Sequence, residues 1–181
     1  VLVNNAGIIS KSQLEHIQLE DWNRIYDINV RGTMLVSKYL VGKLRESCRG
    51  RIINVSSMTA KIGLETYSLY SSTKAAVSNL TKVWALELAS DGITVNALCP
   101  GWADTPMKEK LIQGISQIHD IANDEAEQLI LSHVPQRRFI HPDEIAFSCL
   151  FLASPLAKGI SGQELLIDTG LTNMMKPGLH G

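Results

Sequence analysis

Residues 51–57 read RIINVSS. A short run rich in isoleucine and valine that ends in two serines is typical of a strand followed directly by polar side chains. Long amphipathic segments lie on either side, at Glu20–Leu44 and Tyr70–Leu88, and their apolar residues recur at helical spacing. The sequence therefore predicts a helix, a strand and a second helix in this order.

The same alternation continues outward along the chain. Further strands are predicted at Ile93–Leu98 and Gln163–Ile167, and the short run Val1–Val3 ends in the turn signal Asn-Asn-Ala-Gly. Thr105–His133 is helical but irregular, and Pro142–Ala153 opens with a proline and acids, which favour a first helical turn. Strands separated by helices require crossovers, so we predict an α/β fold: a doubly wound parallel sheet with helices on both faces.

Composition limits the classes of protein that the chain can represent. Its 181 residues suit one domain (1–181), with 45% hydrophobic and 19% charged residues as in ordinary globular proteins. The net charge of −1 favours neither nucleic acid nor an anionic membrane as a partner, and no apolar run approaches a bilayer span. No signal peptide is recognisable, so we expect a cytoplasmic protein.

Cysteine and histidine do not indicate a metal site. Three cysteines (Cys48, Cys99 and Cys149) lack metal-type spacing, and we expect them to be reduced and buried or half-buried. His119, His133 and His141 are expected at the surface, because none has a partner at ligand or triad spacing.

Three segments rich in polar and turn residues each follow a predicted strand: Asn4–Gly7, Ser56-Ser57 and Pro100–Thr105. Ligands of parallel α/β sheets bind beyond the carboxyl ends of the strands. These segments therefore predict one shared site.

Within that site Tyr70 and Lys74 are four residues apart, on one face of a helix. A nearby ammonium lowers the pKa of a phenol, which is about 10 when unperturbed, and so favours proton transfer near neutral pH. Ser57 could hydrogen-bond the same substrate oxygen. Taken alone, the Tyr–Lys pair could equally be an ordinary surface pair, and Asn29, which interrupts an apolar helix face, could be a purely structural amide.

The whole set of motifs resembles the short-chain dehydrogenase/reductase family. The set comprises, in order, Asn4-Asn5-Ala6-Gly7, Asn29, Ser57, Tyr70-x-x-x-Lys74 and Asn96-x-x-x-Pro100-Gly101-x-x-x-Thr105. The resemblance implies an NAD(P)-dependent oxidoreductase that moves hydride between nicotinamide and a secondary alcohol or ketone. The matching stretch is the C-terminal part of a Rossmann-like domain.

Four residues would be catalytic by this resemblance. Tyr70 would act as the general acid/base, and Ser57 would orient the substrate oxygen. Lys74 would lower the pKa of Tyr70 and hold the nicotinamide ribose, and Asn29 would hold a water of a proton relay. Ser56 and Tyr67 are the decoys for Ser57 and Tyr70, because their spacing to the other motifs is wrong.

The resemblance also implies a cofactor site for NAD or NADP. Its residues would be Asn5, Ala6, Gly7, Tyr70, Lys74, Pro100, Gly101, Ala103 and Thr105. The family's glycine-rich phosphate turn and ribose selector would lie upstream and are not in this sequence, which suggests a fragment that binds cofactor poorly by itself. Residues 103–135 would form a mobile substrate lobe, with Trp102 on the pocket wall or in ordinary packing.

The substrate and the partners are expected from the same comparison. The chain resembles the 3-hydroxybutyrate dehydrogenase and the 3-oxoacyl and polyketide ketoreductase branches, yet Ile9, Thr59 and Tyr67 stand where the first of these carries its carboxylate anchors. A neutral or carrier-linked ketone or alcohol is therefore expected, in a homotetramer or homodimer. The alternative is an inactive fragment or scaffold that acts through association; a serine hydrolase is excluded, since Ser57 is not in a G-x-S-x-G elbow.

Overall fold

The computed structural model describes residues 1–47 and 49–173. Its sheet has four parallel strands in the order β1-β2-β3-β4. The strands are β1 (Leu2–Asn4), β2 (Arg51–Val55), β3 (Thr94–Pro100) and β4 (Glu164–Ile167). The main helices are α1 (Leu19–Tyr26), α2 (Thr33–Arg45), α3 (Ser68–Glu87), α4 (Pro106–His119), α5 (Asn123–Ser132) and α6 (Pro142–Ala153).

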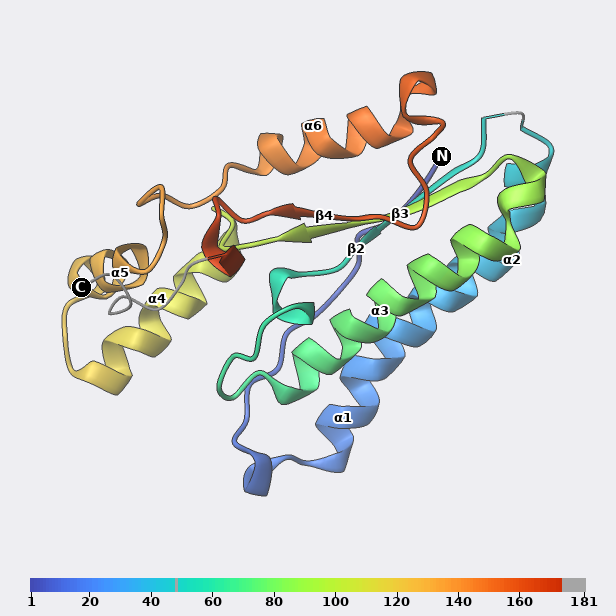
Figure 1. Cartoon of the computed structure of the whole chain (residues 1–181). Coiled ribbons are helices and arrows are strands. Elements are labelled where there is room, and N and C mark those ends of the chain that lie inside the picture. The colour runs from blue at the N-terminus through green and yellow to red at the C-terminus, as the bar shows by residue number, and fades with distance from the viewer. Residues whose placement is uncertain (48, 174–181) are drawn as a thin grey trace.

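Helices cover both faces of the sheet (Figure 1). The helices α2 and α3 lie on one face and α6 on the other, while α4 and α5 lie beyond the carboxyl ends of the strands. The predicted α/β fold with a doubly wound parallel sheet is therefore confirmed. The Cys48 part of the cysteine prediction, and residues 174–181 of the predicted single domain 1–181, lie outside the described residues.

Both faces of β2 are buried, and its two isoleucines point to opposite sides of the sheet, while its polar residues Arg51 and Asn54 are buried as well. Ile52 packs with Val95 and Leu88 toward α2 and α3, while the next residue, Ile53, packs with Leu98 and Leu152 toward α6. Successive strand residues point to opposite faces, so neither can be polar at low cost. Each such side chain contributes roughly 1.5–3 kcal/mol of burial free energy.

The predicted helix Glu20–Leu44 is interrupted. Between α1 and α2 lies a π-helical segment, η2 (Asp27–Gly32), which contains Asn29. Apolar spacing did not reveal this segment, because π-helical turns are rare and short and have no apolar pattern of their own. The predicted Thr105–His133 helix is also two helices, α4 and α5, with a left-handed residue, Asp120, at the break.

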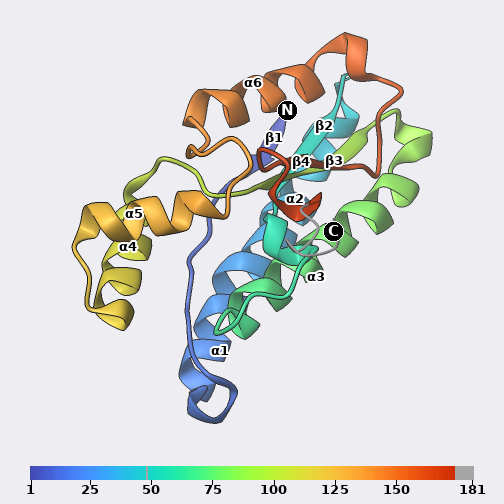
Figure 2. The same cartoon turned by 60° about the vertical axis from the view of Figure 1, so that its left-hand side comes forward.

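The helices α4 and α5 pack on each other and form a lobe with its own core (Figure 2). Its buried residues are Ile112, Ala126 and Ile130. The lobe joins the rest of the chain at a narrow neck, where Ala103 pairs with Ile140 in a parallel bridge. There the Asp104 amide donates to the Ile140 carbonyl (2.9 Å) and the Ile140 amide to the Trp102 carbonyl (2.8 Å).

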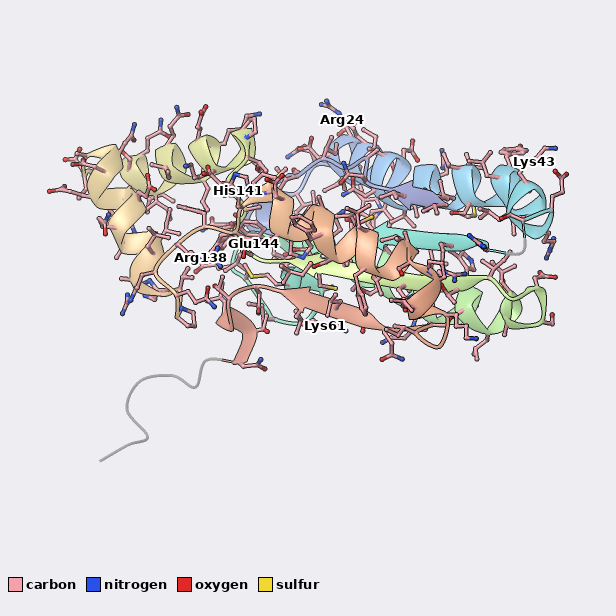
Figure 3. The ribbon with its side chains drawn as sticks, turned by 90° about the horizontal axis from the view of Figure 1, so that it is seen from above. Arg24, Lys43, Lys61, Arg138, His141 and Glu144 are labelled. Atoms are coloured by element: carbon pink, nitrogen blue, oxygen red, sulfur yellow. The ribbon has the colours of Figure 1, made fainter. Side chains whose placement is uncertain are left out.

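An ion pair secures the start of α6 beside this neck (Figure 3). The Arg138 guanidinium contacts both carboxylate oxygens of Glu144, at 2.6 and 2.8 Å, and the His141 amide donates to the same carboxylate. Arg138 and this amide lower the pKa of Glu144 to about 2. The ion pair thus links the segment that follows the lobe to the first turn of α6.

Candidate active site

The predicted strand ends meet at one cavity of about 230 Å³. Its walls come from the ends of β2 and β3, the loop after β1, the first turns of α3 and the lobe. The predicted site residues among its lining are Asn5, Gly7, Ser57, Tyr70, Lys74, Pro100, Gly101, Ala103 and Thr105. Ala6 and Asn29 are not among the lining residues.

Tyr70 lies in the first turn of α3, beside Ser57 at the end of β2. The Ser57 hydroxyl accepts hydrogen bonds from the amide and the hydroxyl of Thr59, both at 3.1 Å, which fixes its position at the start of the following turn. Burial raises the pKa of Tyr70, and the Ser57 hydroxyl partly opposes this by lowering it. The expected net decrease in this pKa is therefore not observed, because desolvation outweighs the neighbouring groups.

Lys74 lies one turn further along α3, with its ammonium nitrogen 5.6 Å from the centroid of the Tyr70 ring. Nζ donates to the Val55 carbonyl at 2.8 Å. Burial lowers the pKa of Lys74 to about 8. The amine therefore stays mostly protonated at neutral pH, and its hydrogen bond is directed at the end of β2.

Asn29 joins the loop after β1 to α3. Its side-chain oxygen accepts from the Ile8 amide (2.8 Å), and its nitrogen donates to the Ile8 carbonyl (2.9 Å) and to the Thr73 hydroxyl (3.0 Å). A Cβ atom built on Gly7 would lie 3.3 Å from both Asn29 Oδ1 and Lys74 Nζ. Asn29 therefore lies directly behind the cavity wall at Gly7. Its side-chain amide makes structural hydrogen bonds, which is one of the two roles that the sequence left open for it.

Replacing Asn29 with alanine is expected to lower the free energy of unfolding by about 2 kcal/mol, because three partly buried polar groups lose their partner. Chemical denaturation measures this value. Asn23 is the matched control: it is an exposed amide on α1, and its alanine variant should change stability by less than about 0.5 kcal/mol. Equal effects of the two substitutions would show that the Asn29 bonds do not contribute.

The Pro100–Thr105 segment forms the floor of the cavity. The Gly101 amide donates to the Ile167 carbonyl at 2.9 Å, and a Cβ on Gly101 would lie only 2.9 Å from the Asp168 Cα. Only glycine fits such a close approach of two backbones. Thr105 then caps α4, with Pro106 at the first helical position, so the chain turns directly from β3 into the lobe.

The two decoys behave differently. The Ser56 hydroxyl bonds to the Lys74 carbonyl and to Ser78 (both 2.9 Å) beneath the sheet, away from the cavity. Tyr67, by contrast, is 5% exposed and lines the cavity with its ring edge-on to Tyr70. The sequence had set Tyr67 aside as the catalytic tyrosine but had placed it, with Ile9 and Thr59, at the positions of the relatives' carboxylate anchors, and all three line the cavity.

Further lining residues escaped the sequence reasoning because irregular segments carry them. Lys11 lies in the loop after β1, and Phe139 reaches the cavity through the neck of the lobe. Both of the open roles of Trp102 are observed, since it lines the cavity and packs against the core of the lobe. Polar residues directly after a strand can be recognised in the sequence as candidate site residues. Residues carried by loops cannot, because the position of a loop depends on contacts with distant parts of the chain.

The remaining sequence expectations concern the cysteines, the histidines, metal binding and membrane spans. Cys99 is a buried free thiol and Cys149 a half-buried one, as expected, and the histidines named above are exposed. Within residues 1–47 and 49–173 no three metal-ligating side chains gather, and no helix in that part of the chain is long and apolar enough to cross a bilayer.

Comparison with known proteins assigns the family. A protein-family model described as "Enoyl-(Acyl carrier protein) reductase" matches residues 1–172. The chain is 39% identical to 3-oxoacyl-(acyl-carrier-protein) reductase FabG of Thermotoga maritima, over 94% of this chain and 65% of the relative. It is 34% identical to D-beta-hydroxybutyrate dehydrogenase of Cupriavidus necator, over 94% and 66%.

A solved structure of an actinorhodin polyketide ketoreductase variant with NADPH superposes with a TM-score of 0.91 at 36% identity, over 96% of this chain and 67% of that one. The chain therefore belongs to the short-chain dehydrogenase/reductase family, as the sequence motifs predicted. It spans about two thirds of the length of the relatives that it matches.

Proposed function

We propose that this chain carries the catalytic part of an NAD(P)-dependent oxidoreductase that interconverts a secondary alcohol and a ketone. The observation that carries the proposal is the shared cavity of Ser57, Tyr70 and Lys74, with the two hydroxyls side by side and the amine one helical turn away. The family membership supports it, as do the relatives named as reductases and dehydrogenases of such groups.

The cavity would suit the nicotinamide end of a dinucleotide. Four lysines contribute to its lining (Lys11, Lys74, Lys108 and Lys110), and no carboxylate among the described residues does. Gly7 and Gly101 keep two walls free of side chains. Lys74, Asn5 and Gly7 would hold the ribose side, while Gly101, Ala103 and Thr105 would hold the nicotinamide. The cofactor, when bound, would supply or accept hydride.

The side chains of the site would manage the proton. In reduction, Tyr70 Oη would donate its proton to the forming alkoxide while the Ser57 hydroxyl donates a hydrogen bond to the same oxygen. The Lys74 ammonium would stabilise the phenolate that results, which is the charge that burial otherwise disfavours. In the reverse direction, the phenolate would take the alcohol proton.

Absorbance of the reduced nicotinamide tests this function directly. The protein, expressed from its complete reading frame, is expected to oxidise NADH or NADPH in the presence of a simple ketone. Trp102 lines the cavity, so cofactor binding should also quench tryptophan fluorescence, and a Trp102→Phe variant should lose part of that quenching. Failure of both nucleotides to quench the fluorescence or support turnover would contradict the proposal and favour the scaffold alternative.

A cytoplasmic location, a homodimer or homotetramer and a mobile substrate lobe at residues 103–135 stay predictions. Exposed apolar side chains on α2, Val36 and Leu40, support self-association, whereas Val77 of α3 packs in the core. Size-exclusion chromatography with light scattering would measure the oligomeric state.

A further inference from the structure

Lys11 is placed beside the candidate site by its loop. The Ser12 amide donates to the Thr66 carbonyl at 2.9 Å, which ties this loop to the segment just before α3. As a result the Lys11 ammonium lies 4.9 Å from the centroid of the Tyr67 ring. That ring lies edge-on to the ring of Tyr70, with 6.3 Å between centroids. One aromatic ring thus separates the Lys11 charge from the proposed acid.

The other lysines of the cavity are differently engaged. Lys74 donates to the Val55 carbonyl, and Lys108 pairs with Asp104 at 2.6 Å. Lys110 is exposed, as Lys11 is, but among the described residues no aromatic ring lies under its ammonium. Among residues 1–47 and 49–173, no carboxylate approaches within 4.0 Å of the Lys11 ammonium.

The surroundings of Lys11 favour an anionic ligand. Partial burial lowers the pKa of its ammonium, and the charge faces an aromatic ring with no counter-ion among the described residues. A cation that has lost part of its water gains most from a charge-assisted hydrogen bond. The apolar walls nearby, including Trp102, Met107 and Phe139, would strengthen such a bond by excluding water.

We propose that Lys11 is a specificity-determining residue that binds an anionic oxygen group of the substrate, a carboxylate or a phosphate, while Ser57 and Tyr70 hold the reacting oxygen. This inference rests on the proposed function and names a substrate class for that same site. The sequence favoured a neutral or carrier-linked ketone or alcohol, and the inference departs only from the neutral alternative, because the charge comes from a loop that the family comparison did not mark.

Two sources could supply the anionic group. A short oxo acid would supply its own carboxylate, a few bonds from the carbonyl. A carrier-linked substrate would instead place a phosphate of its arm at Lys11 as the arm enters the cavity. Both use the same charge-assisted bond, so substrate pairs that differ only in one group can separate them.

The test compares steady-state kinetics of the wild-type protein with those of Lys11→Met and Lys11→Arg. The first probe pair is 3-oxobutanoate and its neutral methyl ester. The second is 3-oxobutanoyl coenzyme A and the N-acetylcysteamine thioester, which lacks phosphate. Lys11→Met should lower the kcat/KM ratio of the anionic to the neutral probe about tenfold in one of the pairs, and Lys11→Arg should largely restore it.

The matched control is Lys38→Met. Lys38 also lies over a tyrosine ring, with Nζ 5.6 Å from the Tyr39 centroid, but on α2 outside the cavity. It should leave both ratios unchanged. A ratio that does not respond to Lys11→Met in either pair would overturn the inference without touching the proposed function.

If turnover is absent, a binding measurement tests the anion site at Lys11 separately from the proposed function. Saturating 3-hydroxybutanoate and, separately, coenzyme A should raise the melting temperature of the wild-type protein in at least one case, and by clearly less in Lys11→Met. This difference would support the Lys11 site even if every ketone probe failed and the proposed function with it. Equal shifts in both proteins, or none, would overturn it.

Discussion

Replacing Tyr70 with phenylalanine is expected to lower kcat by a factor of roughly 10²–10⁴, the usual contribution of a positioned general acid or base. The ring and its packing remain, and only the proton-donating oxygen is lost. Burial already raises the pKa of this hydroxyl, so in the free protein it is protonated at neutral pH and ready to donate. The reduction direction should therefore be measured first, by loss of reduced nicotinamide at saturating substrate.

Tyr67→Phe is the matched control for this prediction. Tyr67 lines the same cavity only three residues earlier, and burial raises the pKa of its hydroxyl to about 12. Its phenylalanine variant should keep kcat within about tenfold, because the proposed proton transfer does not use its hydroxyl. Nucleotide binding, measured by fluorescence quenching, should survive in both variants. If Tyr67→Phe lost as much kcat as Tyr70→Phe, the assignment of the acid would be wrong.

Replacing Lys74 with methionine should have opposite effects on activity and stability. Activity should fall at least about 100-fold, because the phenolate of Tyr70 loses its stabilising cation. The protein itself should become more stable at pH 7, by about 2 kcal/mol. A pKa of about 8 against 10.5 for the free side chain means that folding disfavours the ammonium, and a methionine avoids this cost while losing one hydrogen bond to Val55.

The pH dependence provides the sharper test of the Lys74 variant. Between pH 8 and 10.5 the unfolded wild-type chain binds the Lys74 proton more tightly than the folded one, so this group makes stability rise with pH across that window. The advantage of Lys74→Met should accordingly shrink toward pH 10.5. Lys43→Met, at an exposed ion pair with Glu46, should show only a small effect. A constant advantage at all pH values would contradict the lowered pKa.

The sequence predicted the strands well, because strands buried on both faces appear as short runs of β-branched residues. The run from Arg51 to Val55 is a strand with the predicted bounds, and β3 extends only two residues beyond the predicted end at Leu98. The polar residues after each strand could be assigned to one site, since parallel strands place their carboxyl ends together. No such rule reveals the π-helical turn at Asn29, because a short π-helical segment has no apolar pattern of its own.

Electrostatics and loop positions were harder to predict. The four-residue spacing of Tyr70 and Lys74 correctly indicates proximity, but the direction of each pKa depends on how much water the fold removes. Lys11 reaches the cavity on a loop that is held by the Asn29 bonds to Ile8 and by the bond from the Ser12 amide to the Thr66 carbonyl. Long-range contacts of this kind leave no local pattern in the amino-acid sequence.

The neck between Ala103 and Ile140 gives the molecule two separable parts. The chain leaves the sheet and returns to it at one point, so the intervening segment is a closed insertion with a core of its own. Because its ends are already together, changes inside it cost the sheet little closure entropy. An engineer, or natural selection, could exchange this insertion as a cassette and alter which molecules are accepted while Ser57, Tyr70 and Lys74 stay in place.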